Sequence, residues 1–252
     1  CEADRVRSRL LALGCEAGDR VAACLHNGPA YVILMDACQR SGLVLVPINR
    51  HFEHSAIGDV VSGTRARALF IHEDLAAQFS RSIPNDLTVM VVPVDEHAES
   101  GSQDAARWAT FDSKTHSSPE PIGMPLASIF YTAGSTEKPK GVLRLARGAP
   151  KLVGQVQIQR ELGASIDGLE TTSVAILCAP LYQSDAMRYA QSVLAARATL
   201  VLQQSFDARA TLRLIRRHRV THVFMPSSSV KDLVALHTSV RQSFRQSSVK
   251  RI

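Results

Sequence analysis

The chain has 252 residues, enough for one large or two modest domains with buried cores. Hydrophobic residues make up 45% of it and charged residues 21%, which excludes a chain that is disordered throughout. The 29 basic and 23 acidic residues give a net charge of +6, which suits anionic partners. Aromatic residues amount to 5% and do not interleave with the basic ones, so nucleic acid is not an expected partner.

The cysteines and the apolar runs of the sequence indicate in which cellular compartment the protein is expected. The five cysteines are widely spaced and form no Cys-x-x-Cys pair, which favours a reducing cytoplasm. Cys24 and Cys38 lie in apolar segments and are expected to be small core residues. No apolar run approaches the roughly 20 residues of a membrane span, and no signal peptide is recognisable. Because Cys1 lies within an expected helix, we do not expect it to be the natural start.

Helices and strands alternate over the first 94 residues, as apolar periodicity and breaking residues indicate. Helices are expected at 4–13, 29–40, 55–61 and 73–79, and strands at 21–25, 43–48, 66–71 and 88–94. This alternation predicts an α/β fold of βαβ layers, with mostly parallel sheets flanked by helices. The polar stretch 95–125 is expected to be a surface connection.

The second half continues the same alternation. Strands are expected at 129–132, 143–146, 173–179, 199–202 and 220–225, and helices at 150–162, 185–196, 207–219 and 227–236. Asp207 is a candidate N-cap. Four basic residues end that helix, where they form either a solvated end that complements the helix dipole or a phosphate patch: Arg213, Arg216, Arg217 and Arg219. No internal repeat and no clear linker between domains is visible.

The stretch 129–142 runs from an apolar strand into a loop with hydroxyl groups and glycine, and ends on a lysine. Hydroxyl groups and loop N–H groups donate hydrogen bonds to phosphate oxygens, Gly134 permits turns that a side chain would forbid, and Lys140 supplies charge. A Walker-type loop is excluded, because Pro139 stands where its second glycine should be. The alternative is an ordinary turn between two strands.

This stretch resembles the phosphate-binding signature of the AMP-forming acyl-CoA synthetases, in the adenylate-forming ligase superfamily, written Tyr-Thr-Ser-Gly-Thr-Thr-Gly-x-Pro-Lys-Gly-Val. Ser135 is an allowed alternative, whereas Ala133 replaces a serine and Glu137 a glycine. A second stretch, 18–49, also resembles the opening of these enzymes. The identical positions of the signature are Tyr131, Thr132, Gly134, Thr136, Pro139, Lys140, Gly141 and Val142.

The resemblance implies that a carboxylic acid, expected to be a fatty acid, is activated by ATP with Mg²⁺ and transferred to CoA. It implies that the phosphates are bound by Thr132, Gly134, Ser135, Thr136 and Lys140. The family's adenine, ribose and Mg²⁺ motifs and its C-terminal domain have no counterpart here. We therefore expect residues 1–252 to be a partial N-terminal adenylation domain, inactive alone, with no catalytic residue to assign.

Two further segments resemble the family's acyl pocket. Tyr182 and Gln183 stand in a Pro-Leu-Tyr-Gln segment that usually carries histidine at the last position, and Gln183 keeps the hydrogen bonding without the charge. Met225 and Ser227 stand at the end of an expected strand, where the family resemblance implies a wall of the acyl pocket. The alternatives are an ordinary loop after a strand for the first segment, and a turn into a helix capped by Ser227 for the second.

Parts of the sequence also fit other functions. The histidine pairs 51/54 and 218/222 lack a carboxylate or cysteine partner at a recognised distance, so no metal site is expected. A degenerate or truncated module without catalysis, used for oligomerisation or weak ligand binding, is favoured by Glu137 and Gln183. An amino-acid-activating domain of a peptide synthetase would share the phosphate loop. Whether the chain forms a homo-oligomer stays open.

Overall fold

The computed structural model describes residues 2–94, 127–132, 139–144, 164, 167–236 and 248–250. The chain divides into two compact units, one of residues 1–25 and 29–153, the other of residues 26–28 and 154–252. The expected surface connection at 95–125 and the expected helix at 150–162 lie outside the described residues. Each unit is described by itself.

The first unit is built on a six-stranded sheet in the order β4-β3-β1-β2-β5-β6. All neighbouring strands run parallel except the last pair, β5 and β6, which is antiparallel. This confirms the α/β fold with a mostly parallel sheet. The strands are β1 (Arg20–Cys24), β2 (Val44–Pro47), β3 (Ala68–His72), β4 (Thr88–Val92), β5 (Ala127–Thr132) and β6 (Lys140–Arg144).

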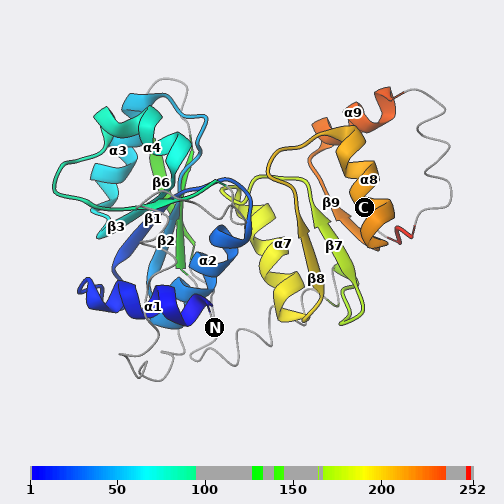
Figure 1. Ribbon diagram of the computed structural model, residues 1–252, viewed down its shortest axis with the longest axis horizontal. Coiled ribbons are helices and arrows are strands. Elements are labelled where there is room, and N and C mark those ends of the chain that lie inside the picture. The colour runs from blue at the N-terminus through cyan, green and yellow to red at the C-terminus, as the bar shows by residue number, and fades with distance from the viewer. Residues whose placement is uncertain are drawn as a thin grey trace. The chain divides into compact units, whose positions relative to one another are not determined.

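Helices cover both faces of this sheet, α1 and α2 on one face and α3 and α4 on the other (Figure 1). Pro29 opens α2, as its fixed φ angle favours, and Gly42 lies past the end of that helix at φ 66°. The elements are α1 (Glu2–Ala12), α2 (Pro29–Ser41), α3 (His54–Thr64), α4 (Glu73–Phe79) and the short 3₁₀ helix η1 (Ser80–Ser82).

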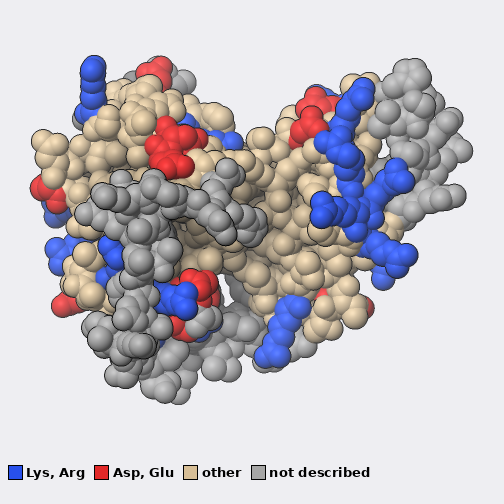
Figure 2. All heavy atoms as spheres, viewed as in Figure 1, with Lys and Arg blue, Asp and Glu red and all other residues tan. Residues whose placement is uncertain are grey.

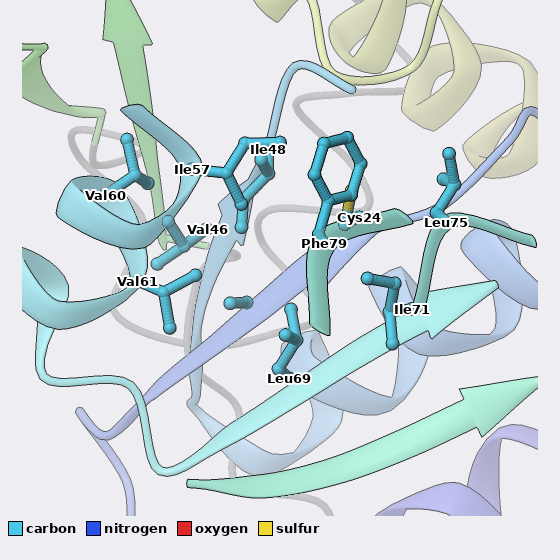
Figure 3. Close-up of a cluster of buried hydrophobic side chains, with 11 residues drawn as sticks. Cys24, Val46, Ile48, Ile57, Val60, Val61, Leu69, Ile71, Leu75 and Phe79 are labelled. Carbon is cyan, nitrogen blue, oxygen red and sulfur yellow. The ribbon is translucent and has the colours of Figure 1, made fainter. Parts of the chain in front are cut away.

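A hydrophobic core fills the space between the sheet and the α3/α4 layer (Figure 3). Alternate residues of each strand point to it, because side chains alternate between the two faces of a strand. The sheet contributes Ala22, Cys24, Val46, Ile48, Leu69 and Ile71, and the helices contribute Ile57, Val60, Val61, Leu75 and Phe79. The burial of Cys24 here, and of Cys38 in α2, confirms that both thiols are core residues.

The second unit has a three-stranded parallel sheet in the order β8-β7-β9. Helices α7 and α8 lie on opposite faces of it (Figure 1). Ile215 of α8 packs on Ile176 and Val223 in the core of one face, and Tyr189 of α7 stacks on Phe224 on the other. The elements are β7 (Val174–Leu177), α7 (Ser184–Ala195), β8 (Thr199–Leu202), α8 (Ala208–His218), β9 (His222–Phe224) and α9 (Ser227–Ala235).

The N-termini of α8 and α9 can be compared with the N-caps that the sequence suggested. Asp207 caps α8, since its Oδ1 accepts a hydrogen bond from the Ala210 N–H at 2.6 Å, which confirms the predicted N-cap. The prediction that Ser227 caps α9 is wrong, because Pro226 occupies the N-cap position and Ser227 is already helical. Among the described residues, no helix is long and apolar enough to span a membrane.

Candidate functional site

The β5–β6 hairpin holds the two ends of the predicted phosphate loop. Thr132, the last residue of β5, is paired with Lys140, the first residue of β6. The predicted strand began only at Leu143, but pairing with β5 extends it back to Lys140, whose side chain is exposed. Gly134, Ser135 and Thr136 lie outside the described residues, as does the side chain of Thr132.

A close approach across this hairpin requires glycine at position 141. Gly141 is paired with Tyr131, and a Cβ on it would lie 2.9 Å from Tyr131 Cζ and 2.9 Å from Ile129 Cγ2. The Tyr131 ring therefore lies where a side chain at residue 141 would be. Burial raises the pKa of the Tyr131 hydroxyl, and the charge of Arg20 acts in the opposite direction.

The hairpin loop leaves the sheet at its carboxyl edge. Strands β1, β2, β3 and β5 are parallel, so their carboxyl ends share one edge, and β5 ends there at Thr132. Ligands of open α/β sheets bind outside the carboxyl ends of the strands. The two residues that flank the loop, Thr132 and Lys140, thus lie at the edge of the sheet where such ligands bind.

The second unit brings the two predicted acyl-pocket segments to one edge of its own sheet. Tyr182 and Gln183 follow β7, and Met225 and Ser227 follow β9, its parallel neighbour. The Cys178 N–H donates to the Phe224 carbonyl at 2.8 Å, which ties the two segments together where they leave the strands. The sequence order alone would not bring them together, since some forty residues separate them (183 to 225).

The four side chains differ in exposure. Gln183 and Ser227 are exposed, Tyr182 is half-buried, and Met225 is partly buried against the core cluster of Ile176, Cys178, Ile215, Val220 and Val223. Met225 can therefore offer an apolar wall, whereas Gln183 can offer an amide to a polar group.

Sequence reasoning missed one residue of this edge. Asn27 lies between the expected strand 21–25 and the expected helix 29–40 and was assigned no role, yet its side chain makes two hydrogen bonds to the backbone that leads into the Tyr182 segment. Its partners lie 152 and 154 residues away along the chain. No local pattern in the sequence signals such a contact.

The four histidines of the pairs 51/54 and 218/222 differ in their surroundings. His222 is buried, with Nδ1 2.8 Å from Thr221 Oγ1 and Nε2 3.2 Å from the Gly168 carbonyl, while His218 is exposed at the end of α8. The His54 ring lies 4.9 Å from the Phe79 ring. Over the residues that the structure describes, no three His, Cys, Asp or Glu side chains gather to hold a metal ion.

Basic side chains gather over α8 in the second unit (Figure 2). Arg213, Arg216, Arg217 and Arg219 are all exposed, as a solvated helix end requires. Cationic groups at the last turn complement the negative end of the helix dipole. The phosphate-patch alternative for these residues stays a hypothesis.

The mostly parallel sheet with helices on both faces defines the class of the protein, an α/β fold. The chain belongs to the family described as AMP-binding enzyme, which matches residues 1–252. The related proteins include AMP-forming acyl-CoA ligases, as the resemblance of the signature loop had indicated.

Two curated relatives and one solved structure illustrate the likeness. The chain is 28% identical over 254 residues to 3-[(3aS,4S,7aS)-7a-methyl-1,5-dioxo-octahydro-1H-inden-4-yl]propanoyl:CoA ligase of Mycobacterium tuberculosis, covering 96% of the chain and 47% of the relative. It is 27% identical over 222 residues to feruloyl-CoA synthase of Amycolatopsis, covering 87% and 41%. The inhibitor-bound N-terminal domain of FACL13 from Mycobacterium tuberculosis superposes with a TM-score of 0.75 at 22% identity, covering 93% and 56%.

These comparisons fix the fold and the extent of the match. The likeness to FACL13 confirms the fold of an adenylate-forming ligase N-terminal domain. The chain spans less than half the length of the two curated relatives. Their names give chemically different acids, so the sequence identity selects no substrate.

Proposed function

We propose that this chain contributes part of an enzyme that activates a carboxylic acid with ATP and transfers the acyl group to CoA. In the first step a carboxylate oxygen attacks the α-phosphorus of ATP, and pyrophosphate leaves with the electron pair of the broken P–O bond. In the second step the CoA sulfur attacks the acyl carbon, AMP leaves, and the thiol proton passes to solvent. The substrate that we propose is a fatty acid, with an aryl acid as the alternative, because the stretch 18–49 resembles the CoA ligases of both kinds of acid.

The observation that carries this proposal is the pairing of Thr132 with Lys140 at the carboxyl edge of the first sheet. It places a strand-end hydroxyl residue and a lysine at the two ends of the loop. Thr132, Gly134, Ser135, Thr136 and Lys140 would hold the β- and γ-phosphates, and the lysine would neutralise charge that develops on the leaving pyrophosphate.

The acid would bind at the carboxyl edge of the second sheet. Met225 would contact the apolar part of the acid, and Tyr182 would contribute half-buried aromatic surface. Gln183 and Ser227 are exposed at the same edge and would hydrogen-bond polar groups. Because no residue with a charge replaces the usual histidine, these contacts would orient the acid without an ion pair.

The proposal includes Mg²⁺ and CoA. Mg²⁺ would arrive as the ATP complex and reduce the charge on the phosphates. No described residue is assigned to hold it or CoA. The four described cysteines are free and buried, which supports the reducing cytoplasm as the location that we propose.

Carboxylate-dependent exchange between ATP and pyrophosphate tests the adenylation step directly. The panel is octanoate, dodecanoate, hexadecanoate and benzoate, with circular dichroism on the same sample to confirm folding. Exchange that needs one of these acids would support the proposal and show that this chain suffices for the first step. Without exchange, calorimetric binding of MgATP would still support a phosphate site. No heat from MgATP, in the original chain and in Glu137→Gly alike, would overturn the proposal and favour the non-catalytic module.

A further inference from the structure

The segment between β1 and α2 supplies an unexpected member of the second unit. Residues 26–28 belong to that unit, although the chain on either side of them belongs to the first. Asn27 is only 8% exposed. A buried amide needs hydrogen-bond partners, and a short loop seldom has them within itself.

Asn27 finds its partners on the backbone that follows β7. Its Nδ2 donates to the Ala179 carbonyl at 2.8 Å, and its Oδ1 accepts from the Leu181 N–H at 2.8 Å. Ala179 and Leu181 are themselves buried. The residue between them, Pro180, has no N–H to donate. The Asn27 amide thus acts like a peptide group of an additional strand, with a donor and an acceptor side by side.

These bonds hold the segment that begins the candidate acid site. Just beyond Leu181, the Gln183 N–H closes a turn on the Pro180 carbonyl at 3.0 Å, and the Gln183 carbonyl accepts the first helical bond from Met187 at 3.0 Å. The backbone from Ala179 to Gln183 is therefore fixed at one end by β7 and Asn27 and at the other by α7. The directions of Tyr182 and Gln183 depend on that backbone.

We propose that Asn27 is a positioning residue, which holds the loop 180–183 in the form that binds the carboxylic acid. The proposal rests on the proposed function for the identity of the ligand. No other residue type of similar size offers this donor and acceptor pair: an ionised aspartate would lack the donor, and leucine would lack both. Tyr182 and Gln183 would contact the acid, whereas Asn27 acts only through them.

A matched control lies at the opposite end of the same strand. Thr221 Oγ1 bonds to the N–H of Val174 at 3.0 Å and to its carbonyl at 3.1 Å, so it also clamps one residue of the β7 strand by its side chain. Thr221 precedes β9 and Val174 opens β7, at the amino edge of the sheet. Thr221→Val removes these two backbone bonds, together with the contact of Thr221 Oγ1 with His222 Nδ1, away from the loop.

The experiment compares Asn27→Leu with Thr221→Val in the full chain, by two measurements. Hydrogen exchange followed by NMR gives the exchange rate of the Leu181 amide, with the Leu177 amide in β7 as the internal reference. The ratio of the two rates should rise at least tenfold in Asn27→Leu and should be unchanged in Thr221→Val. Calorimetry with decanoate should show a dissociation constant raised at least tenfold in Asn27→Leu alone, with that of MgATP unchanged. If Asn27→Leu does not fold, Asn27→Ser, which is too short to reach both groups, replaces it.

The outcomes separate the proposal from the proposed function. Faster exchange at Leu181 with unchanged decanoate binding would overturn the positioning role and leave a purely structural clamp. A uniform rise in exchange across β7, or equal losses in both variants, would also overturn it. If the original chain binds no decanoate while Leu181 is protected, the acid site of the proposed function fails, and the role of Asn27 in acid binding fails with it.

Discussion

Gly141→Ala should destabilise the β5–β6 hairpin, although it adds a single methyl group. The new Cβ would lie 2.9 Å from Ile129 Cγ2 and 2.9 Å from Tyr131 Cζ. Since carbon atoms pack at about 3.5–4.0 Å, both side chains would have to move by about 0.6 Å or more. Such overpacking costs about 1–3 kcal/mol, and about 0.5–1 kcal/mol is regained because alanine suits a strand better than glycine. The free energy of unfolding should therefore fall by about 0.5–2 kcal/mol.

Urea unfolding followed by circular dichroism measures this change, and Gly63→Ala is the matched control. A Cβ at Gly63, in α3, would meet nothing within 4 Å, so the same substitution should stabilise the chain by about 0.5–1 kcal/mol. MgATP binding should weaken in Gly141→Ala but not in the control, because Lys140 is the adjacent residue. A Gly141→Ala chain as stable as the original, with Gly63→Ala behaving as expected, would refute the packing of Tyr131 over residue 141.

Three shorter predictions follow from the same structure. Lys140→Met should weaken MgATP binding about 10- to 100-fold in calorimetry, because one charge-assisted hydrogen bond is lost. Lys231 is an exposed lysine of α9, so Lys231→Met should leave the dissociation constant of MgATP unchanged. Asp207→Ala should lower the free energy of unfolding by about 0.5–2 kcal/mol in urea, because α8 loses its cap; an unchanged midpoint would contradict this. Burial raises the pKa of Cys24 from 9.0 to about 12, so the native thiol stays protonated while the unfolded one ionises, and stability is lost as pH rises from 9 towards 12. Cys24→Ala should reduce the loss of unfolding free energy between pH 8 and pH 10 by about 1.4 kcal/mol, and an equal loss in both chains would refute the burial argument.

Local chemistry was sufficient to predict the scaffold of both units. Strands such as β2 and β7 are apolar without interruption, Pro29 and Gly42 mark the two ends of α2, and Asp207 marks the start of α8. Each of these signals acts within a few residues of its own position, which is the range over which propensity and capping operate. The signature loop was recognisable because its order of Gly, Pro and Lys is specific.

Features that depend on distant partners were not predictable in the same way. Lys140 and Gly141 have low strand propensity, so the expected strand began at Leu143, but pairing with β5 outweighs that preference. Asn27 looks like a turn residue, and its role depends on two backbone groups that are more than 150 residues away. Local pattern therefore predicted which elements form, whereas the contacts that shape the candidate site depend on how the sheet orders them.

Gln183 gives a direct test of how the acid is oriented. The side chain is exposed, so a histidine there would titrate near its ordinary pKa of about 6.5, with little shift from burial. Decanoate binding by the original chain should be flat between pH 5.5 and 8, because Gln183 carries no charge. In Gln183→His, binding should tighten about fivefold as pH falls through this range, since a unit charge at 4 Å in water is worth about 1 kcal/mol. Gln78→His, an exposed position of α4, should stay flat. A flat profile in Gln183→His would mean that the carboxylate does not bind beside residue 183, and the acid site would have to be sought away from the β7 edge.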